Sequence, residues 1–171
     1  ITDRSIYRYF ATKADMVLET ALLFWSEAMA QVDSQAHMEL DGDICGADCI
    51  LSILQGYANL YFTHRQMLIF VHEAEAYLNR SGKALLVENK PPAPFEQSAG
   101  PLSSAIHKGI ADGSVRTDID LPSLYYNTYD ALLGLIQKLA IGGRNNTADD
   151  EYARIRLEQF CTMMESFYRK R

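Results

Sequence analysis

Apolar residues recur at intervals of three and four along most of the chain, a spacing that places them on one face of an α-helix. The first such stripe predicts a long amphipathic helix over about residues 13–36. Its members are Leu18, Leu22, Trp25, Met29 and Val32. Just before it, Thr12 and Asp15 have the spacing of a capping box, which satisfies free backbone N–H groups at a helix start. We therefore expect a helix to begin beside Lys13.

Further helical stripes follow, separated by clear breaks. They predict helices over about residues 50–63, 65–80 and 95–112, with Pro101 either starting or kinking the third. Two long helices come next, one capped by Asp120 and ending at Gly142, the other opening with the capping box of Thr147 and Asp150. The intervening breaks are residues 39–48, the Ser81-Gly82 pair and the proline-rich stretch at 91–94. Because no strand pattern of useful length appears, the predicted fold class is all-α.

Composition sets the class of protein. The chain has 171 residues, enough for a sizeable core, and 48% of them are hydrophobic. No run of about 18 apolar residues exists, so we expect no membrane span. Three cysteines do not suggest a disulfide framework, which fits a reducing cytoplasm. We therefore expect a cytoplasmic protein without a membrane partner.

The first thirteen residues, ITDRSIYRYFATK, have the features of a short, capped surface helix. Thr2 is a good helix N-cap. Ile6 and Phe10 are four residues apart and can share one buried face, which leaves polar side chains on the outer faces. Together with the capping signal at Thr12, the segment predicts a short helix, a tight break and a long connecting helix.

This stretch resembles the end of the DNA-binding domain of the tetracycline-repressor (TetR) family. The family pattern is roughly apolar-Ser/Thr-x-Gly-Ser/Thr-apolar-Tyr-x-Tyr/His-Phe-x-Ser/Thr-Lys, and nearly every position fits. Arg4 stands where the family usually has Gly, and Asp3 stands where a basic or small residue is common. Because these two departures alter the reading surface, the operator sequence is not carried over. The chain opens inside the motif, so we expect it to be a fragment of a longer protein.

The resemblance implies two parts: residues 1–13 as the remainder of a helix-turn-helix, and residues 14–171 as a helical ligand-binding and dimerisation domain, with 13–36 as the connecting helix. It implies DNA contacts by Thr2, Arg4, Ser5, Tyr7, Tyr9 and Lys13. Arg4 is our choice for base reading, because arginine can bond guanine bidentately in the major groove. The net charge of −6 does not oppose this, since the first thirteen residues carry +2 and the remainder −8.

By the same resemblance, the helices over 50–63, 65–80 and 95–112 enclose a cavity for an organic ligand with apolar bulk. We expect it to be lined by aromatic and polar side chains, although plain core packing explains any one of them equally well. The candidates are Tyr57, Tyr61, Phe62, Met67, Phe70, His72, Glu73, Tyr77, Phe95, His107, Tyr125 and Tyr129. The last two helices would pair with their copies in a homodimer, with Leu135 and Phe160 as interface anchors.

Catalytic and metal-binding motifs have no positive support. Cys45, Cys49 and Cys161 lack the further ligands that a metal site needs, and we expect structural cysteines, no metal and no cofactor. His72-Glu73 is the one pair where an enzyme reading would start, and it lacks the second His of a zinc-protease helix.

The favoured hypothesis is a ligand-responsive bacterial transcriptional regulator, most simply a repressor released from double-stranded operator DNA by a small organic ligand. The alternatives are an all-α ligand-binding or adaptor module without DNA binding, and a small helical enzyme.

Overall fold

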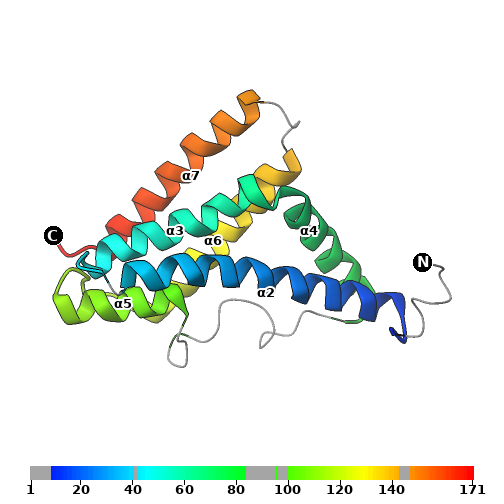
Figure 1. Ribbon diagram of the computed structural model, residues 1–171, viewed down its shortest axis with the longest axis horizontal. Helices are drawn as coiled ribbons and strands as arrows, with labels where there is room; N and C mark the ends of the chain where they lie inside the picture. Colours follow the sequence, from blue (N-terminus) through cyan, green and yellow to red (C-terminus); the bar gives the residue numbers. More distant parts are fainter. Residues whose placement is uncertain (1–8, 41, 84–94, 96–99, 143–146) are drawn as a thin grey trace.

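The computed structural model describes residues 9–40, 42–83, 95, 100–142 and 147–171. This part of the chain forms six helices and no strand, which confirms the all-α class (Figure 1). The helices are α2 (Lys13–Leu40), α3 (Gly46–Thr63), α4 (Arg65–Arg80), α5 (Pro101–Asp112), α6 (Leu121–Gly142) and α7 (Thr147–Tyr168). The proposed DNA contacts at positions 2, 4, 5 and 7 and the break at 91–94 lie outside the described residues.

Local signals set most of the helix ends. The Thr12 hydroxyl accepts the backbone N–H of Asp15 at 3.1 Å and donates to its carboxylate at 2.7 Å, so the predicted capping box forms. Asp120 caps α6 by accepting the backbone N–H of Ser123 at 3.1 Å. Pro101 starts α5 rather than kinking it. At the other end of α5, Gly113 has a φ of 79°, which a residue with a Cβ rarely adopts.

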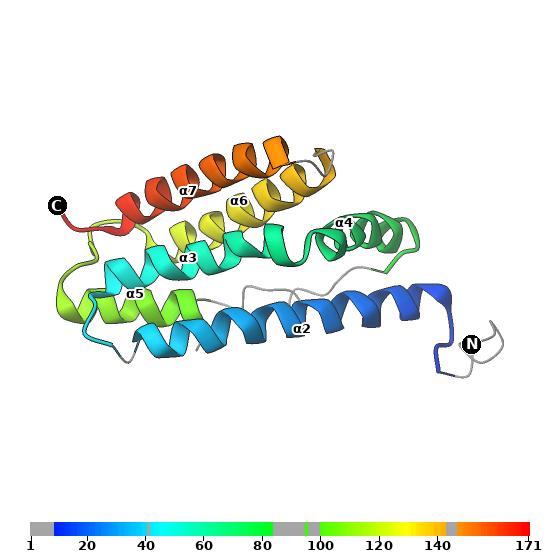
Figure 2. The same ribbon diagram turned by 45° about the horizontal axis from the view of Figure 1, so that its top comes forward.

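The helices are arranged around α3, which packs against α2, α5, α6 and α7. In Figure 2, α2 runs along one side of the molecule, while α6 and α7 lie on the other side of α3. The short α4 lies at the end where α2 begins, and α5 lies at the opposite end, beside the last turns of α2 (Figure 1). The core therefore runs the length of α3, and its residues are buried around most of that helix. They include Ile50, Ile53, Leu54, Tyr57, Ala58, Leu60 and Tyr61.

The buried stripe of α2 differs in part from the predicted one. Trp25 and Val32 are buried as expected, but Leu18 and Leu22 are only half-buried. Their places at the core are taken by Phe24 and by small residues. The small residues are Ala14, Ala21 and Ala28. Alanines leave room for the neighbouring helices to approach α2 closely, so the buried face combines these alanines with Phe24, Trp25 and Val32.

The C-terminal junction is the place where α3, α5 and α7 meet, and we define it by Gly46, Gly109, 112–116 and 168–170. A Cβ on Gly46 would lie 2.1 Å from the backbone nitrogen of Gly109, so α3 and α5 cross in near backbone contact. A Cβ on Gly109 would in turn lie 2.2 Å from a methyl group of Val115. Glycine is required at both positions because no side-chain atom fits between these helices.

Polar groups complete the C-terminal junction. The first backbone N–H groups of α3 donate to side chains at the end of α5 and just after it. Gly46 donates to the carboxylate of Asp112 at 2.7 Å, and Ala47 donates to the hydroxyl of Ser114 at 3.1 Å. The segment after α5 also pairs with the end of α7, through the backbone hydrogen bond from Lys170 to Ser114 at 2.8 Å and a matching one after Val115. One short junction thus caps α3 and fixes the end of α7.

Within the described residues, no helix combines the length and the apolar composition that crossing a membrane requires.

Candidate functional site

Two of the six proposed DNA contacts lie within the described residues. Tyr9 precedes α2 and is 84% exposed, so its ring and hydroxyl are available to a partner. Lys13 is the first residue of α2, and its ammonium lies 5.6 Å from the centre of the Tyr77 ring of α4. Lys13 is therefore oriented by a cation–π contact with the body rather than projecting freely.

A second contact joins the same two helices. Lys83, just after α4, donates to the Asp15 carboxylate in the first turn of α2, and the Lys83 and Thr12 hydrogen bonds hold the pKa of Asp15 below its usual value. We call this pair of contacts, Lys13–Tyr77 and Lys83–Asp15, the head contact. It connects the far end of α4 to the first turn of α2, where the segment predicted to contact DNA ends.

Several predicted ligand residues form a closed aromatic cluster between α3 and α6. The hydroxyl groups of Tyr57 and Tyr129 lie 2.8 Å apart, and Tyr125 packs edge-on against Tyr129 at 5.1 Å between ring centres. Phe95 stacks against Tyr125 at 5.2 Å. Burial raises the pKa of both Tyr57 and Tyr129, so their hydroxyls stay neutral and act as hydrogen-bond donors and acceptors.

The rest of the predicted ligand set is not gathered into this cluster. His72 and Glu73 are exposed on α4, which removes the buried acid or base that the enzyme hypothesis needed there. His107 is exposed as well, although its ring lies 5.2 Å from that of Phe95. Phe62, Met67, Phe70 and Tyr77 are half-buried. Tyr61 is buried but donates to Asp150 on α7 at 3.3 Å. The predicted cavity thus reduces, within the described residues, to the Tyr57–Tyr125–Tyr129 core.

Sequence reasoning missed two polar contacts. Thr128 and Tyr168 share a buried hydrogen bond of 2.8 Å between α6 and the end of α7. Arg65 follows Tyr57 and Tyr61 at the same interval of four, which is the signal that could have drawn attention to it. Its guanidinium lies 5.0 Å from the centre of the Tyr61 ring and pairs with Asp150 at 3.3 Å.

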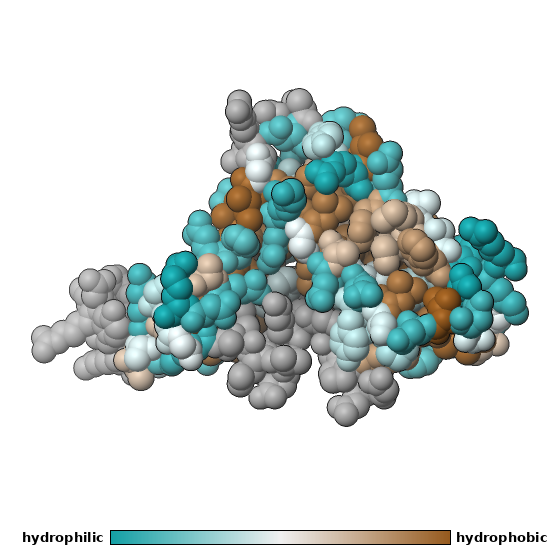
Figure 3. Space-filling view, turned by 180° about the vertical axis from the view of Figure 1, so that it is seen from behind, coloured by the Kyte–Doolittle hydropathy of each residue, from teal (hydrophilic) through white to brown (hydrophobic). Residues whose placement is uncertain are grey.

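The outer side of α6 and α7 carries an apolar face. Leu135 and Phe160, the predicted interface anchors, are half-buried and line one hollow of about 320 Å³ together with Met163. Further large apolar side chains on α7 are exposed, namely Tyr152, Ile155, Met163 and Phe167. Figure 3 shows hydrophobic patches running obliquely across the back of the molecule, broken by hydrophilic side chains. An exposed apolar set of this size on one helix is typical of an interaction surface.

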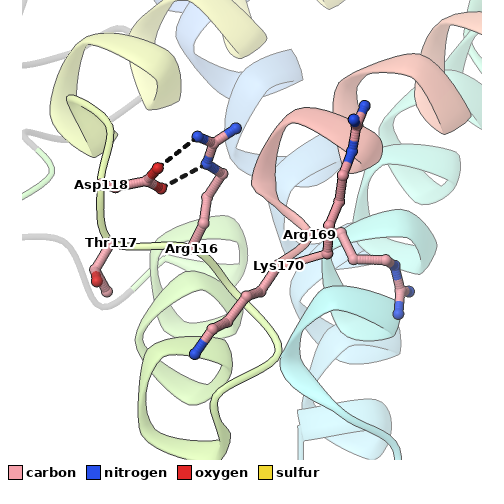
Figure 4. A pocket seen from close by; sticks show the side chains of 6 residues that line it. Arg116, Thr117, Asp118, Arg169 and Lys170 are labelled. Carbon is pink, nitrogen blue, oxygen red and sulfur yellow. Dashed lines mark hydrogen bonds and ion pairs between the residues drawn. The ribbon is translucent and has the colours of Figure 1, made fainter.

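A larger hollow of about 510 Å³ lies beside the C-terminal junction and is rich in cations (Figure 4). Two of its three arginines, Arg116 and Arg169, are paired with carboxylates. The Nε and Nη2 groups of Arg116 each donate to Asp118 at 2.7 Å, which lowers the pKa of that carboxyl. Arg169 donates to Glu165 and Asp48. Because carboxylates fill these positions, the arginines stabilise the junction more than they attract an anion.

The cysteines are structural in their surroundings. Cys49 and Cys161 are buried, and burial raises the pKa of the Cys161 thiol to about 12. Cys45 is half-buried beside Asp48. Among the residues that the structure describes, no group of three or more His, Cys, Asp or Glu side chains is placed to hold a metal ion.

Comparison with known proteins identifies no relative: no protein-family model matches the chain, and neither a curated protein nor a solved structure is significantly similar to it.

Proposed function

We propose that the chain belongs to a ligand-responsive, DNA-binding transcriptional regulator that acts as a homodimer and most simply as a repressor. The observation that carries this proposal is the motif at residues 1–13, with its Tyr-x-Tyr-Phe-x-Thr-Lys core followed at once by a capped, 28-residue helix. In such a protein the short helix reads the major groove, and the long helix connects it to the body.

The charge distribution supports this division of labour. Arg4, Arg8 and Lys13 give the head a local positive charge, while the body is strongly acidic. Phosphate affinity comes from local cations, so the head provides it. An acidic body is repelled by DNA and keeps the two apart except at the head.

A homodimer supplies the second reading head that a two-fold operator requires. The apolar face of α6 and α7 suits this role, because self-association would cover Tyr152, Ile155, Met163 and Phe167. A charge at its centre, as in Leu135→Glu, is expected to convert the dimer to a monomer in sedimentation experiments. Thr162→Glu places the same charge on an exposed position of α7 and serves as the control. Unchanged sedimentation of the Leu135 variant would remove this face from the interface.

The head contact offers a route from the body to the DNA. A ligand that shifts α4 alters the position of Lys83 and Tyr77 relative to the first turn of α2. The ligand acts only if it binds the DNA-competent and the released arrangements with different affinities. The proposed mechanism is thus a population shift between two positions of α2 in the dimer.

The test is the binding of the full-length protein to DNA upstream of its own gene over a series of salt concentrations. The proposal predicts specific binding with a steep salt dependence. Arg4→Ala should reduce the preference for the cognate site by about tenfold to a hundredfold, the cost of one bidentate base contact. Arg171→Ala changes the charge equally at an exposed position beyond α7 and should leave the preference intact.

Two outcomes count against the regulator. If Arg4→Ala and Arg171→Ala bind with the same preference as the parent, the motif does not read bases. If specific binding is absent at every salt concentration, the ligand-binding or adaptor module without DNA binding becomes the better description.

A further inference from the structure

Arg65 is a nearly buried cation at the corner where α3 ends and α4 begins. Its side chain is 13% exposed, and its guanidinium lies 5.0 Å from the centre of the Tyr61 ring. A cation–π contact of this kind orients the planar guanidinium but supplies no hydrogen-bond acceptor for its N–H groups. The hydrogen bonding of Arg65 must therefore come from elsewhere.

One carboxylate meets only part of that requirement. Nη1 of Arg65 lies 3.3 Å from Oδ1 of Asp150 in the first turn of α7, and the Tyr61 hydroxyl donates to the same oxygen at 3.3 Å. Both distances are longer than the usual length of a charge-assisted hydrogen bond. Asp150 is 49% exposed and therefore faces solvent on its other side.

The remaining edge of the guanidinium has no partner among the residues that the structure describes. Nε and Nη2 of Arg65 are closed off from solvent, and neither donates a hydrogen bond to an acceptor in this part of the chain. These two N–H groups point in parallel and form the fork that matches the two oxygens of a carboxylate. A buried donor without an acceptor is costly, and most costly on a charged group.

Other arginines of the same molecule show what this edge ordinarily binds. In Arg116, Nε and Nη2 both donate to Asp118, each at 2.7 Å. In Arg169, Nε donates to Glu165 and Nη2 donates to Asp48. These two side chains are 38% and 41% exposed, so water could have served them. The least exposed of the three guanidiniums is the one whose fork lacks a carboxylate.

We propose that the fork of Arg65 binds the carboxylate group of a small organic acid. Tyr61 would contact one face of the guanidinium, and Asp150 would accept the hydrogen bond from Nη1. The two ligand oxygens would accept hydrogen bonds from Nε and Nη2. Entry would run past Asp150, which is 49% exposed, and the apolar part of the acid would leave the fork on this side.

The probe is benzoate, compared with the neutral benzamide and with sodium chloride at equal ionic strength. Titration calorimetry of the purified chain is expected to show saturable binding of benzoate at one site and none of benzamide. Arg65→Lys keeps the charge but removes the fork, and should weaken benzoate binding at least tenfold. The matched control is Arg154→Lys, because Arg154 also lies over a ring, that of Phe62 at 4.8 Å, but is 54% exposed.

Asp150→Asn sharpens the test. The substitution keeps the size of the side chain and removes the negative charge that competes with an incoming carboxylate, so benzoate should bind several-fold more tightly. A purely structural role of Asp150 predicts no gain. The proposal is overturned if benzoate shows no saturable heat up to about 10 mM, a range that includes weak binding. It is also overturned if Arg65→Lys binds benzoate as the parent does.

A measurement without ligand guards against a variant that fails to fold. Arg65→Met replaces the cation by an apolar side chain of similar length. Because Arg65→Met also removes the ion pair with Asp150 and the contact with Tyr61, it is compared with Asp150→Asn, which removes the same ion pair and leaves the fork in place. If the fork lacks an acceptor within the described residues, Arg65→Met should lower the urea midpoint little more than Asp150→Asn does, and a much larger drop would contradict the proposal.

A role for this acid in releasing DNA rests on the proposed function, whereas benzoate binding does not. Benzoate binding that depends on Arg65, without specific DNA binding by the full-length protein, would retain the site and reject the regulator. Specific DNA binding that benzoate leaves unchanged would retain the regulator and reject Arg65 as its ligand site.

Discussion

At the C-terminal junction three segments meet through backbone hydrogen bonds and a glycine–glycine crossing, whereas at the head contact α4 meets α2 through side-chain contacts of two lysines. In the junction, Asp112 accepts the first N–H of α3, and a Cβ on Gly46 would overlap the backbone of α5. In the head contact, Lys83 is 40% and Asp15 29% exposed. Buried backbone contacts hold one arrangement, while exposed ion pairs contribute little to stability. The difference indicates a rigid arrangement at the C-terminal junction and a more adjustable one at the head contact, beside the segment proposed to bind DNA.

The largest expected effect comes from separating α3 and α5. Gly46→Ala should destabilise the protein by about 3 kcal/mol, at the upper end of the usual range for overpacked cores, because the added Cβ meets backbone rather than a movable side chain. Gly134→Ala on α6 is the control, since its Cβ would have nothing within 4 Å and should stabilise the helix by up to about 1 kcal/mol. Urea unfolding measures both, and equal stability of the two variants would refute a tight junction.

A smaller loss is expected when only the polar part of the C-terminal junction is removed. Asp112→Ala leaves the N–H groups of Gly46 and Ser114 without their acceptor and should cost about 1–2 kcal/mol, the range for a lost helix cap. Asp112→Asn keeps one acceptor oxygen and should recover part of the loss. Identical stabilities of the Ala variant and the parent would show that water replaces the carboxylate without cost.

Acid should weaken the C-terminal junction. Hydrogen bonds from Ser114 and Gly46 lower the pKa of Asp112. Hydrogen bonds from Arg169 and Cys45 lower the pKa of Asp48. A carboxyl whose folded pKa lies below its unfolded value of about 4 contributes its full stability above that pH and loses it as the pH falls through the folded pKa. The free energy of unfolding should therefore fall between pH 5 and about pH 2. Asp112→Asn should show a shallower fall, and a parallel curve would exclude Asp112 as a cause.

The smallest expected effect on stability is at the head contact. Lys83→Ala should change the free energy of unfolding by no more than about 0.5 kcal/mol, because the ion pair is partly exposed. Amide exchange in the first turns of α2 should nevertheless become faster, since α4 no longer holds Asp15. Lys138→Ala, at an exposed position of α6, is the control and should leave that exchange unchanged. If Lys83→Ala destabilised the protein as much as Asp112→Ala does, the head contact would be as important for stability as the C-terminal junction.

These two ends also differ in how far the sequence predicts them. Thr12, Asp15, Pro101 and Gly113 act on neighbouring residues, so the sequence pattern located the corresponding helix ends. The contact of Gly46 with Gly109 depends on how two helices cross, and no local pattern encodes it. For the same reason, the pattern correctly placed Trp25 and Val32 in the buried stripe of α2 but also included Leu18 and Leu22, which are only half-buried.

The candidate site divides in the same way. The motif at residues 1–13 was recognisable because its residues are consecutive, although most of them lie outside the described residues. The pairing of Tyr57 with Tyr129 was not predictable, because the two are 72 positions apart and aromatic residues are equally common in plain cores. The exposure of His72 and Glu73 was not predictable either, since a helical stripe does not say which polar neighbours stay in water.

The burial of the cysteines makes the separation of α3 from α7 measurable by chemistry. Cys49 on α3 and Cys161 on α7 are buried, while Cys45 at the start of α3 is half-buried. Only a thiolate reacts with an alkylating reagent, and burial keeps the Cys161 thiol protonated until its surroundings open. A reagent applied under native conditions should therefore modify Cys45 first, and the rate at which Cys49 and Cys161 follow would report how often these helices part. The protein thus carries an intrinsic kinetic probe of its rigid end, one that requires neither a label, nor DNA, nor a ligand.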